Sequence, residues 1–255
     1  MKKVGFWLLG IFAYVIFTLV MTPASWWLKL AKLPAGVELG PVTGTLWSGA
    51  AQGVSVKPLY IPVLKWQLDV GALWRGQLGV NLEGGSLRDD NYPYFQVKAE
   101  LTPSTVTVLP SNLRLPVAGI LPNIQLPMPA DASGSIVLNV TEFQLGQPYC
   151  SVLNGNASWQ DARFKAPTGW IDLRAIHATL RCVGGNIVLN TTPDNPLALQ
   201  VQAEVLADSY KIEGMLKPDA SMPKEVHQAM QFVGQADANG NFPITLEGRI
   251  RTQLN

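Results

Sequence analysis

The chain has 255 residues, and its 19 lysines and arginines nearly balance its 18 aspartates and glutamates, giving a formal net charge of +1. Nucleic-acid binding needs a concentrated positive field, so this balance excludes nucleic acid as a partner. Only 15% of the residues are charged, whereas Gly and Pro number 23 and 19. This composition is typical of many short strands joined by turns, and it predicts a mainly β protein.

The chain begins with a basic dipeptide and a long apolar segment. Lys2 and Lys3 precede eighteen uncharged residues at 4–21. As a helix this segment would be about 27 Å long, close to the roughly 30 Å of a bilayer's hydrocarbon core. We therefore predict a single transmembrane anchor over 4–21, with residues 1–3 in the cytoplasm under the positive-inside rule. A cleaved signal peptide is the alternative, although its apolar part is usually only about 7–15 residues long.

The residues after this segment indicate where the membrane ends. Trp26 and Trp27 follow it, and Lys29 and Lys32 come next. Tryptophan and lysine at the end of a span are typical of the membrane–water interface. We expect the remaining residues to form a domain on the far side of the membrane, with an N-terminal half that covers residues 22–102.

Alternation of apolar and polar residues with a period of two dominates this domain. Such alternation is typical of antiparallel strands that have one buried and one solvated face. The clearest alternating segments are 64–70, 95–101, 171–175, 197–205 and 244–250. Turn-forming residues such as the Gly-Gly pairs at 84–85 and 184–185 separate them, so the sequence predicts an elongated antiparallel sheet.

A proline-rich zone interrupts the alternation near the middle of the chain. Prolines stand at positions 103, 110, 116, 122, 127 and 129. Because proline removes a backbone donor, we expect this zone to be irregular, extended or at a sheet edge. We predict that residues 103–133 connect the N-terminal half of the domain to a C-terminal half at 134–255.

One short helix is predicted near the C-terminus. Pro223 suits a first helical turn, apolar residues recur at helical spacing from 226 to 233, and Gly234 can end the helix. We expect this helix to pack over the sheet.

The two cysteines, Cys150 and Cys182, both fall in the part of the chain that is predicted to lie across the membrane from the cytoplasm. An even number of cysteines in an oxidising compartment predicts a disulfide, and two buried free thiols are the alternative. A metal site is disfavoured, since His177 and His227 lack ligand-like spacing to the cysteines.

Signatures of catalysis are missing from the sequence. There is no Gly-x-Ser-x-Gly motif, no His-Glu-x-x-His motif and no glycine-rich phosphate loop before a helix. His177 lies in an alternating segment and His227 beside polar Gln228, where structural or solvated histidines are expected. We predict no catalytic, cofactor-binding or metal-binding residues, and an anchored hydrolase around His177 is the minor alternative.

Five tryptophans are the candidate interface residues. Tryptophan is enriched at the energetic centres of protein interfaces, so an apolar partner-binding patch could include them. The alternative is that they fill the core of the sheet. The five are Trp47, Trp66, Trp74, Trp159 and Trp170.

Several motifs resemble protein N of the bacterial type II secretion system. They are Gly-Thr-Leu-Trp-Ser-Gly at 44–49, Leu-Lys-Trp-Gln-Leu at 64–68, Gly-Asn-Ala-Ser-Trp at 155–159 and Gly-Asn-Phe-Pro-Ile-Thr-Leu-Glu-Gly-Arg-Ile at 240–250. The resemblance implies a non-enzymatic scaffold component of the bacterial inner membrane, with a periplasmic domain and without cofactor. Such a component supports export of folded proteins from the periplasm across the outer membrane. Its implied partners are other inner-membrane components of the system and the outer-membrane secretin.

This family is also similar to AsmA-like and lipid-bridge proteins, which carry a curved, elongated antiparallel sheet (the β-taco type) behind one N-terminal span. That similarity implies an alternative function, the binding or transfer of a lipid or glycolipid in an apolar β trough. A continuous apolar lining with an open seam would favour lipid, whereas a closed packed core would favour a scaffold.

Overall fold

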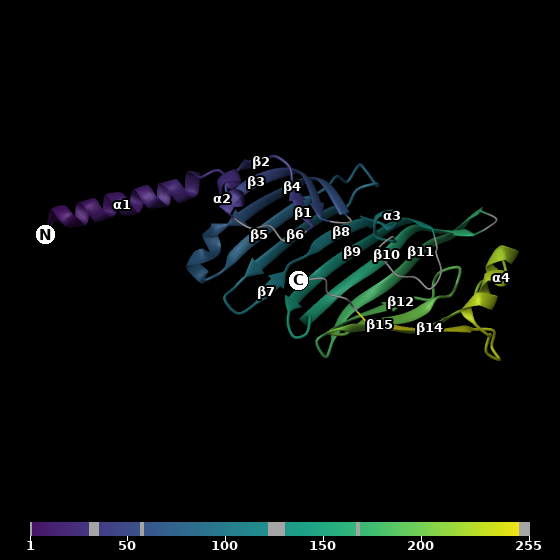
Figure 1. Ribbon diagram of the computed structural model, residues 1–255. Coiled ribbons are helices and arrows are strands. Elements are labelled where there is room, and N and C mark those ends of the chain that lie inside the picture. Colours follow the sequence, from purple (N-terminus) through teal and green to yellow (C-terminus); the bar gives the residue numbers. More distant parts are fainter. Residues whose placement is uncertain (1, 31–35, 57–58, 122–130, 167–168, 250–255) are drawn as a thin grey trace.

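The computed structural model describes residues 2–30, 36–56, 59–121, 131–166 and 169–249. Within these ranges fifteen strands form a single antiparallel sheet, so the predicted β class is confirmed (Figure 1). Lys32, the prolines at 122, 127 and 129, and residue 250 of the last alternating segment lie outside the described residues.

The helices are few, and most of them are short. They are α1 (Lys2–Met21), α2 (Ala24–Leu30), the 3₁₀ helix η1 (Val70–Arg75), α3 (Val117–Ile120) and α4 (Lys224–Val233). A helix therefore covers the segment predicted as the anchor. Across the described residues, no helix is both long enough and apolar enough to cross a membrane. The transmembrane anchor remains a prediction.

The strands follow one another almost in chain order through the sheet. In the first half they are β1 (Val37–Leu39), β2 (Val42–Gly44), β3 (Ser48–Val56), β4 (Leu59–Asp69), β5 (Leu78–Gly84), β6 (Tyr94–Leu101), β7 (Val106–Val108) and β8 (Ser111–Pro116). In the second half they are β9 (Ala132–Leu145), β10 (Cys150–Ala166), β11 (Gly169–Val183), β12 (Asn186–Thr191), β13 (Gln200–Val205), β14 (Ser209–Leu216) and β15 (Phe242–Arg249).

Four of the five alternating segments locate strands as predicted, namely β4, β6, β11 and β15, although the segment 64–70 runs one residue past β4, because Val70 begins η1. The fifth, 197–205, was predicted too long, because β13 starts only at Gln200. The Asn195 side chain explains the difference: its Oδ1 accepts hydrogen bonds from the N–H groups of Leu197 (3.2 Å) and Leu199 (3.0 Å). A side-chain amide that satisfies backbone groups in this way holds a turn where the alternation alone indicates a strand.

The proline-rich zone contains a broken strand inside the sheet. β7 and β8 both lie between β6 and β9, separated from each other by Leu109 and Pro110. Ser111 is buried at the break, where its hydroxyl accepts a hydrogen bond from Lys98 N–H (3.1 Å) and donates one to Leu109 O (2.7 Å). Because this hydroxyl replaces a missing backbone partner, the sheet continues past the proline. The division into two halves remains a prediction.

The apolar core is divided into three clusters along the sheet. The N-terminal cluster consists of Ala51, Val54 and Ile61. The central cluster consists of Cys150, Leu153, Ala157, Ala178 and Leu180. The C-terminal cluster consists of Ala162, Ile171, Leu173, Ile176, Leu216, Val226 and Met230.

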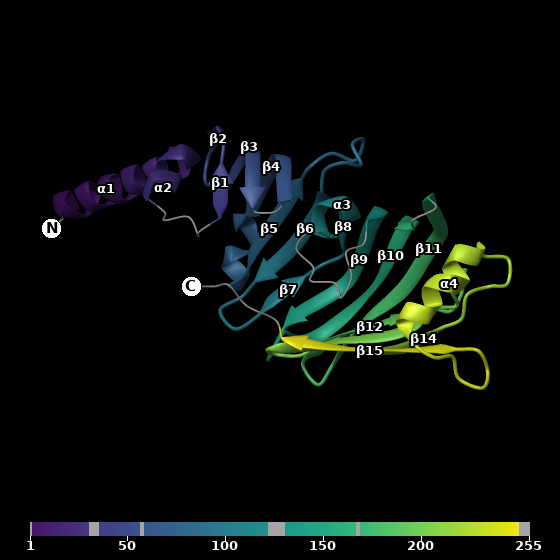
Figure 2. The same cartoon turned by 45° about the vertical axis from the view of Figure 1, so that its right-hand side comes forward.

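The predicted C-terminal helix is α4, and it packs on the sheet as expected. Pro223 precedes it and Gly234 follows it. Its buried residues Val226 and Met230, four positions apart, belong to the C-terminal cluster. In Figures 1 and 2, α4 lies at the end of the sheet farthest from α1.

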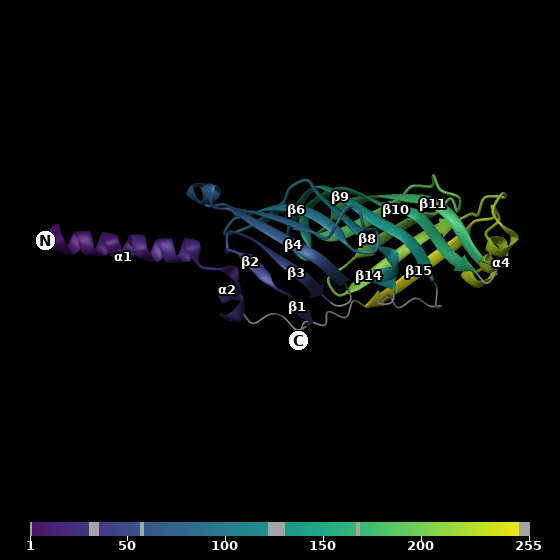
Figure 3. The same cartoon turned by 90° about the horizontal axis from the view of Figure 1, so that it is seen from above.

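The sheet is strongly curled in its second half. Strands β9 to β11 sweep upward, whereas β12, β14 and β15 pass along the lower side of the molecule (Figure 2). Seen from above, the domain is elongated, with α1 extending from one end (Figure 3). The predicted elongated sheet is therefore present, and its relation to the AsmA-like type stays a prediction.

Candidate interaction surfaces

Two of the five candidate tryptophans pack against core clusters of the sheet. Trp66 on β4 packs on the N-terminal cluster, and its Nε1 donates a hydrogen bond to Leu46 O (3.1 Å). Trp159 on β10 packs on the C-terminal cluster and donates to Ser133 O (3.0 Å). An indole with both its ring and its N–H engaged inside the domain fills the core. For these two residues, the geometry favours the structural alternative.

The other three tryptophans differ in burial and do not share one element. Trp47 is half-buried in the turn between β2 and β3. Trp74 on η1 is 95% exposed, and Trp170 at the start of β11 is 53% exposed. The structure therefore does not gather the five into one patch, and contact of any of them with a partner stays a prediction.

The structure adds an apolar surface that the sequence analysis did not single out. Val70 and Leu73 are exposed beside Trp74 on η1. We call these three residues the η1 tip. In the sequence the alternation continues to Val70, and Leu73 and Trp74 follow it before the next strand. Without the tertiary structure, these residues could equally have been a buried turn.

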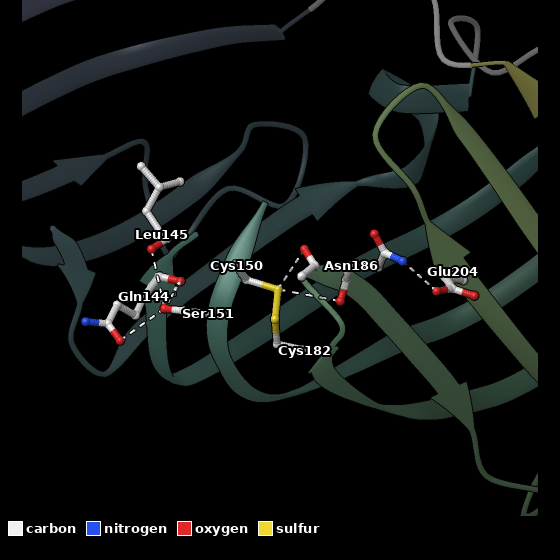
Figure 4. Close-up of a disulfide and its surroundings, with 8 residues drawn as sticks. Gln144, Leu145, Cys150, Ser151, Cys182, Asn186 and Glu204 are labelled. Carbon is white, nitrogen blue, oxygen red and sulfur yellow. Dashed lines mark hydrogen bonds between the residues drawn. A yellow bond between two sulfur atoms is a disulfide. The ribbon is translucent and has the colours of Figure 1, made fainter. Parts of the chain in front are cut away.

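Cys150 and Cys182 form the predicted disulfide (Figure 4). Their Cα atoms are 6.1 Å apart, within the range that a disulfide spans. Cys150 is buried at the start of β10, and its N–H donates a hydrogen bond to Gly185 O (3.2 Å) in the turn between β11 and β12. The disulfide therefore links the start of β10 to the end of β11, beside the turn that leads into β12.

The two histidines considered in the sequence lie on separate elements of the described part of the chain. His177 on β11 and His227 on α4 are both exposed. No group of three or more His, Cys, Asp or Glu side chains within the described ranges could hold a metal ion. An open cavity of about 500 Å³ includes Arg174, Asp219 and Ser221 in its lining. Hydrogen bonds from Ser221 lower the pKa of the exposed Asp219 carboxyl below 3.8.

The last strand leaves an unpaired sheet edge. All eight residues of β15 pair with β14, and within the described residues β15 has no neighbour on its other side. The opposite end of the strand order is β1, which is only three residues long. A free edge presents unpaired backbone N–H and C=O groups to which an extended segment can add. Of the two strands that end the sheet in the described ranges, β15 is the longer.

Comparisons with known proteins agree with the motifs. The profile of the family "Type II secretion system (T2SS), protein N" matches residues 35–245. The chain is 30% identical to type II secretion system protein N of Aeromonas hydrophila over 98% of this chain and 99% of that protein. It is 27% identical to the Vibrio cholerae protein of the same name, over 98% and 99% of the two chains. No solved structure matches the chain. Since the family profile covers most of the sequence, this chain belongs to the family of type II secretion system protein N.

Proposed function

We propose that this chain is a non-enzymatic assembly component of the type II secretion machine, held at the bacterial inner membrane. In this role it supports the export of folded proteins from the periplasm across the outer membrane. Family membership supports the secretion role. The observation that carries the assembly role is the edge of β15, the last strand in the strand order, which has no second neighbour within the described residues, whereas α1 extends from the end of the domain that holds the first strands.

The proposal has α1 as a membrane tether with residues 1–3 in the cytoplasm and residues 22–255 in the periplasm. In its support, the sequence at 4–21 carries no charge. Large apolar side chains of α1, including Trp7, Phe12 and Phe17, are exposed, as side chains that contact lipid would be. The disulfide also fits an oxidising periplasm.

Alkaline extraction of bacterial membranes tests the tether. The full chain should stay with the membrane pellet, and protease added to spheroplasts should degrade the domain while leaving a small protected N-terminal fragment. Release of the chain into the alkaline supernatant would contradict the tether.

We propose that β15 recruits an extended segment of another secretion component by adding it as a further strand. The candidate donors are the other inner-membrane components of the system and the outer-membrane secretin. Backbone hydrogen bonds would supply the affinity, and the exposed β15 side chains Thr245, Leu246 and Glu247 would select the partner.

Site-specific photo-crosslinking in cells that carry the whole secretion system tests this contact. A photoreactive residue at the exposed Thr245 should give discrete adducts with a secretion component. The matched control is the exposed Gln202 on β13, a strand that has neighbours on both sides. Equal adduct patterns at both positions, or no secretion component at Thr245, would contradict the proposal.

Lipid or glycolipid binding is the second candidate function. It is favoured by the central cluster, around which several large apolar residues remain only half-buried in a curled sheet: Leu138, Val140, Phe143, Ile187 and Leu189. Native mass spectrometry of the full chain, released from detergent inside the instrument, tests it. Lipid retained in a defined ratio and lost in a Leu138→Asn variant would support binding. A lipid-free spectrum for the unaltered chain would contradict it.

A further inference from the structure

The η1 tip is an exposed apolar surface on a short helix that connects the end of β4 to the start of β5. Trp74 is 95% exposed and Leu73 is 53% exposed. The helix is fixed at both ends: Asp69 Oδ1 accepts a hydrogen bond from Gly71 N–H (2.9 Å), and Gly76 ends the helix with φ of 70°. Exposing an indole to water at the end of a capped helix has an unfavourable free energy unless something outside the domain covers it.

A chain of contacts joins the η1 tip to the end of α1. Pro23, two residues after α1, forms a β-bridge with Thr45 in the turn between β2 and β3. From the same turn, Trp47 O accepts a hydrogen bond from Leu68 N–H (2.7 Å), one residue before the Asp69 cap. The exit of α1 and the start of η1 therefore lie near the same ends of strands β2, β3 and β4.

The figures agree with these contacts. In Figures 1 and 3, η1, drawn in blue between β4 and β5, projects from the same end of the domain as α1. In both views it reaches back to about the level at which α1 joins α2. Trp26 on α2, at the same end, is also exposed.

We propose that the η1 tip inserts into the interfacial layer of the lipid bilayer beside α1, with Trp74 as the main anchoring side chain. This inference rests on the proposed membrane tether. Indole rings favour the headgroup layer, because the ring is apolar while its N–H can bond to lipid carbonyls or water. Arg75, the last residue of η1, is exposed where lipid phosphates would lie.

The bilayer fits this surface better than a protein partner does. The η1 tip has only three apolar residues on one short helix, so its surface is small. Stable protein interfaces, in contrast, bury about 800 Å² of surface per partner. If α1 crosses a membrane, the η1 tip lies at the level of that membrane's surface. A second attachment would also fix the orientation of the sheet, which a single helix would leave free to rotate.

Fluorescence quenching in vesicles tests the inference with the full chain. Leu73→Cys is labelled with nitrobenzoxadiazole under non-reducing conditions, which keep the disulfide intact. The protein is then reconstituted into phosphatidylethanolamine–phosphatidylglycerol vesicles that contain a lipid with a nitroxide near the headgroup. We expect blue-shifted emission and strong quenching, both reduced by adding Trp74→Ser.

The matched control is a label at Leu87→Cys. Leu87 is 64% exposed in the loop at the other end of β5, and Arg114 holds that loop through a hydrogen bond to Leu87 O (3.2 Å). Quenching should be several-fold stronger at position 73 than at position 87. Equal quenching at the two positions would overturn the inference.

Vesicle flotation separates this inference from the tether. A chain that floats with vesicles but shows no quenching at position 73 keeps its tether and contradicts insertion of the η1 tip. A chain that does not float contradicts both. A label at position 73 that is blue-shifted in native membranes but not in pure lipid vesicles would identify a protein as the occupant, and would overturn the assignment to lipid.

Discussion

Single polar side chains organise the turns of this sheet, and Asp237 is a clear case. It lies between α4 and β15, where its Oδ1 accepts hydrogen bonds from the N–H groups of Asn239 and Asn241, both at 2.8 Å. The Asn241 side chain donates to Oδ2 at 2.9 Å. These donors stabilise the ionised carboxylate. The turn that starts the edge strand therefore depends on one charge.

The first prediction concerns the pKa of Asp237. The hydrogen bond from the Asn241 side chain, followed by that from its backbone, lowers this pKa below 3.8. A lowered pKa gives stability that is present above the unfolded-state value and is lost as the pH falls through the folded-state value. In the Asn241→Ala variant, NMR titration of the Asp237 carboxyl should show a higher pKa, shifted towards 3.8. An unchanged pKa would contradict the role of Asn241.

The second prediction concerns the disulfide. The two cysteines are 32 residues apart in the sequence, so opening the cross-link should lower the free energy of unfolding by about 3–4 kcal/mol in the chain-entropy model. Urea unfolding of a Cys150→Ala, Cys182→Ala double variant measures the loss. Reductant should destabilise the unaltered protein similarly and leave the double variant unchanged. Equal unfolding midpoints with and without the disulfide would contradict the prediction.

At the scale of elements, α4 shows how a mainly polar helix is held in place. Its stability depends on a narrow apolar stripe, since an isolated ten-residue helix is marginal in water. Val226 is fully buried in that stripe and contacts the C-terminal cluster of the sheet. The helix therefore depends on the sheet, and the packing over this end of the sheet depends on the helix.

The third prediction follows from this packing. Val226→Ala removes two buried methyl groups and leaves a cavity, so it should lower the free energy of unfolding by about 2 kcal/mol. Gln228→Ala, at an exposed position of the same helix, should have almost no effect. Urea unfolding of both variants provides the comparison. A Val226→Ala midpoint equal to that of the Gln228→Ala control would show that α4 is not packed on the sheet.

Element prediction from the sequence succeeded where the local pattern agreed with the tertiary contacts. Alternation located β4, β6, β11 and β15, because each has one face against the core. It failed at 197–199, where the Asn195 side chain holds a turn. It also could not place β7 and β8 inside the sheet, since the Ser111 hydroxyl that carries the sheet past Pro110 acts through Lys98 on a neighbouring strand.

At the scale of the whole molecule, the fold is a meander with mostly neighbour-to-neighbour contacts. The strands pair almost in sequence order, and the core is divided into three clusters rather than one. Stability in such an arrangement is distributed unevenly, as in repeat proteins. The longest strands, β9, β10 and β11, have 14, 17 and 15 residues, and the disulfide joins the last two.

The fourth prediction is a gradient of hydrogen exchange along the sheet. Peptides from β10 and β11 should exchange most slowly, because both strands have neighbours on each side and are cross-linked. Peptides from β1, β2 and β15 should exchange first, because they are short or lie at an edge. Hydrogen–deuterium exchange with mass spectrometry measures this gradient. Uniform protection across all strands would instead indicate a single cooperative unit.

The sequence by itself determined the β class, the position of α4, the pairing of Cys150 with Cys182 and the resemblance to the secretion family. These properties depend on local periodicity, on a count of two cysteines and on short motifs. Only the tertiary structure decided that Trp66 and Trp159 pack against the core clusters while Trp74 projects from η1, and that β15 ends the sheet in the described part of the chain. The physical reason is that alternation fixes which residues of a strand share a face. Which strands become neighbours, and which side chains stay uncovered, depends on contacts between residues far apart in the chain.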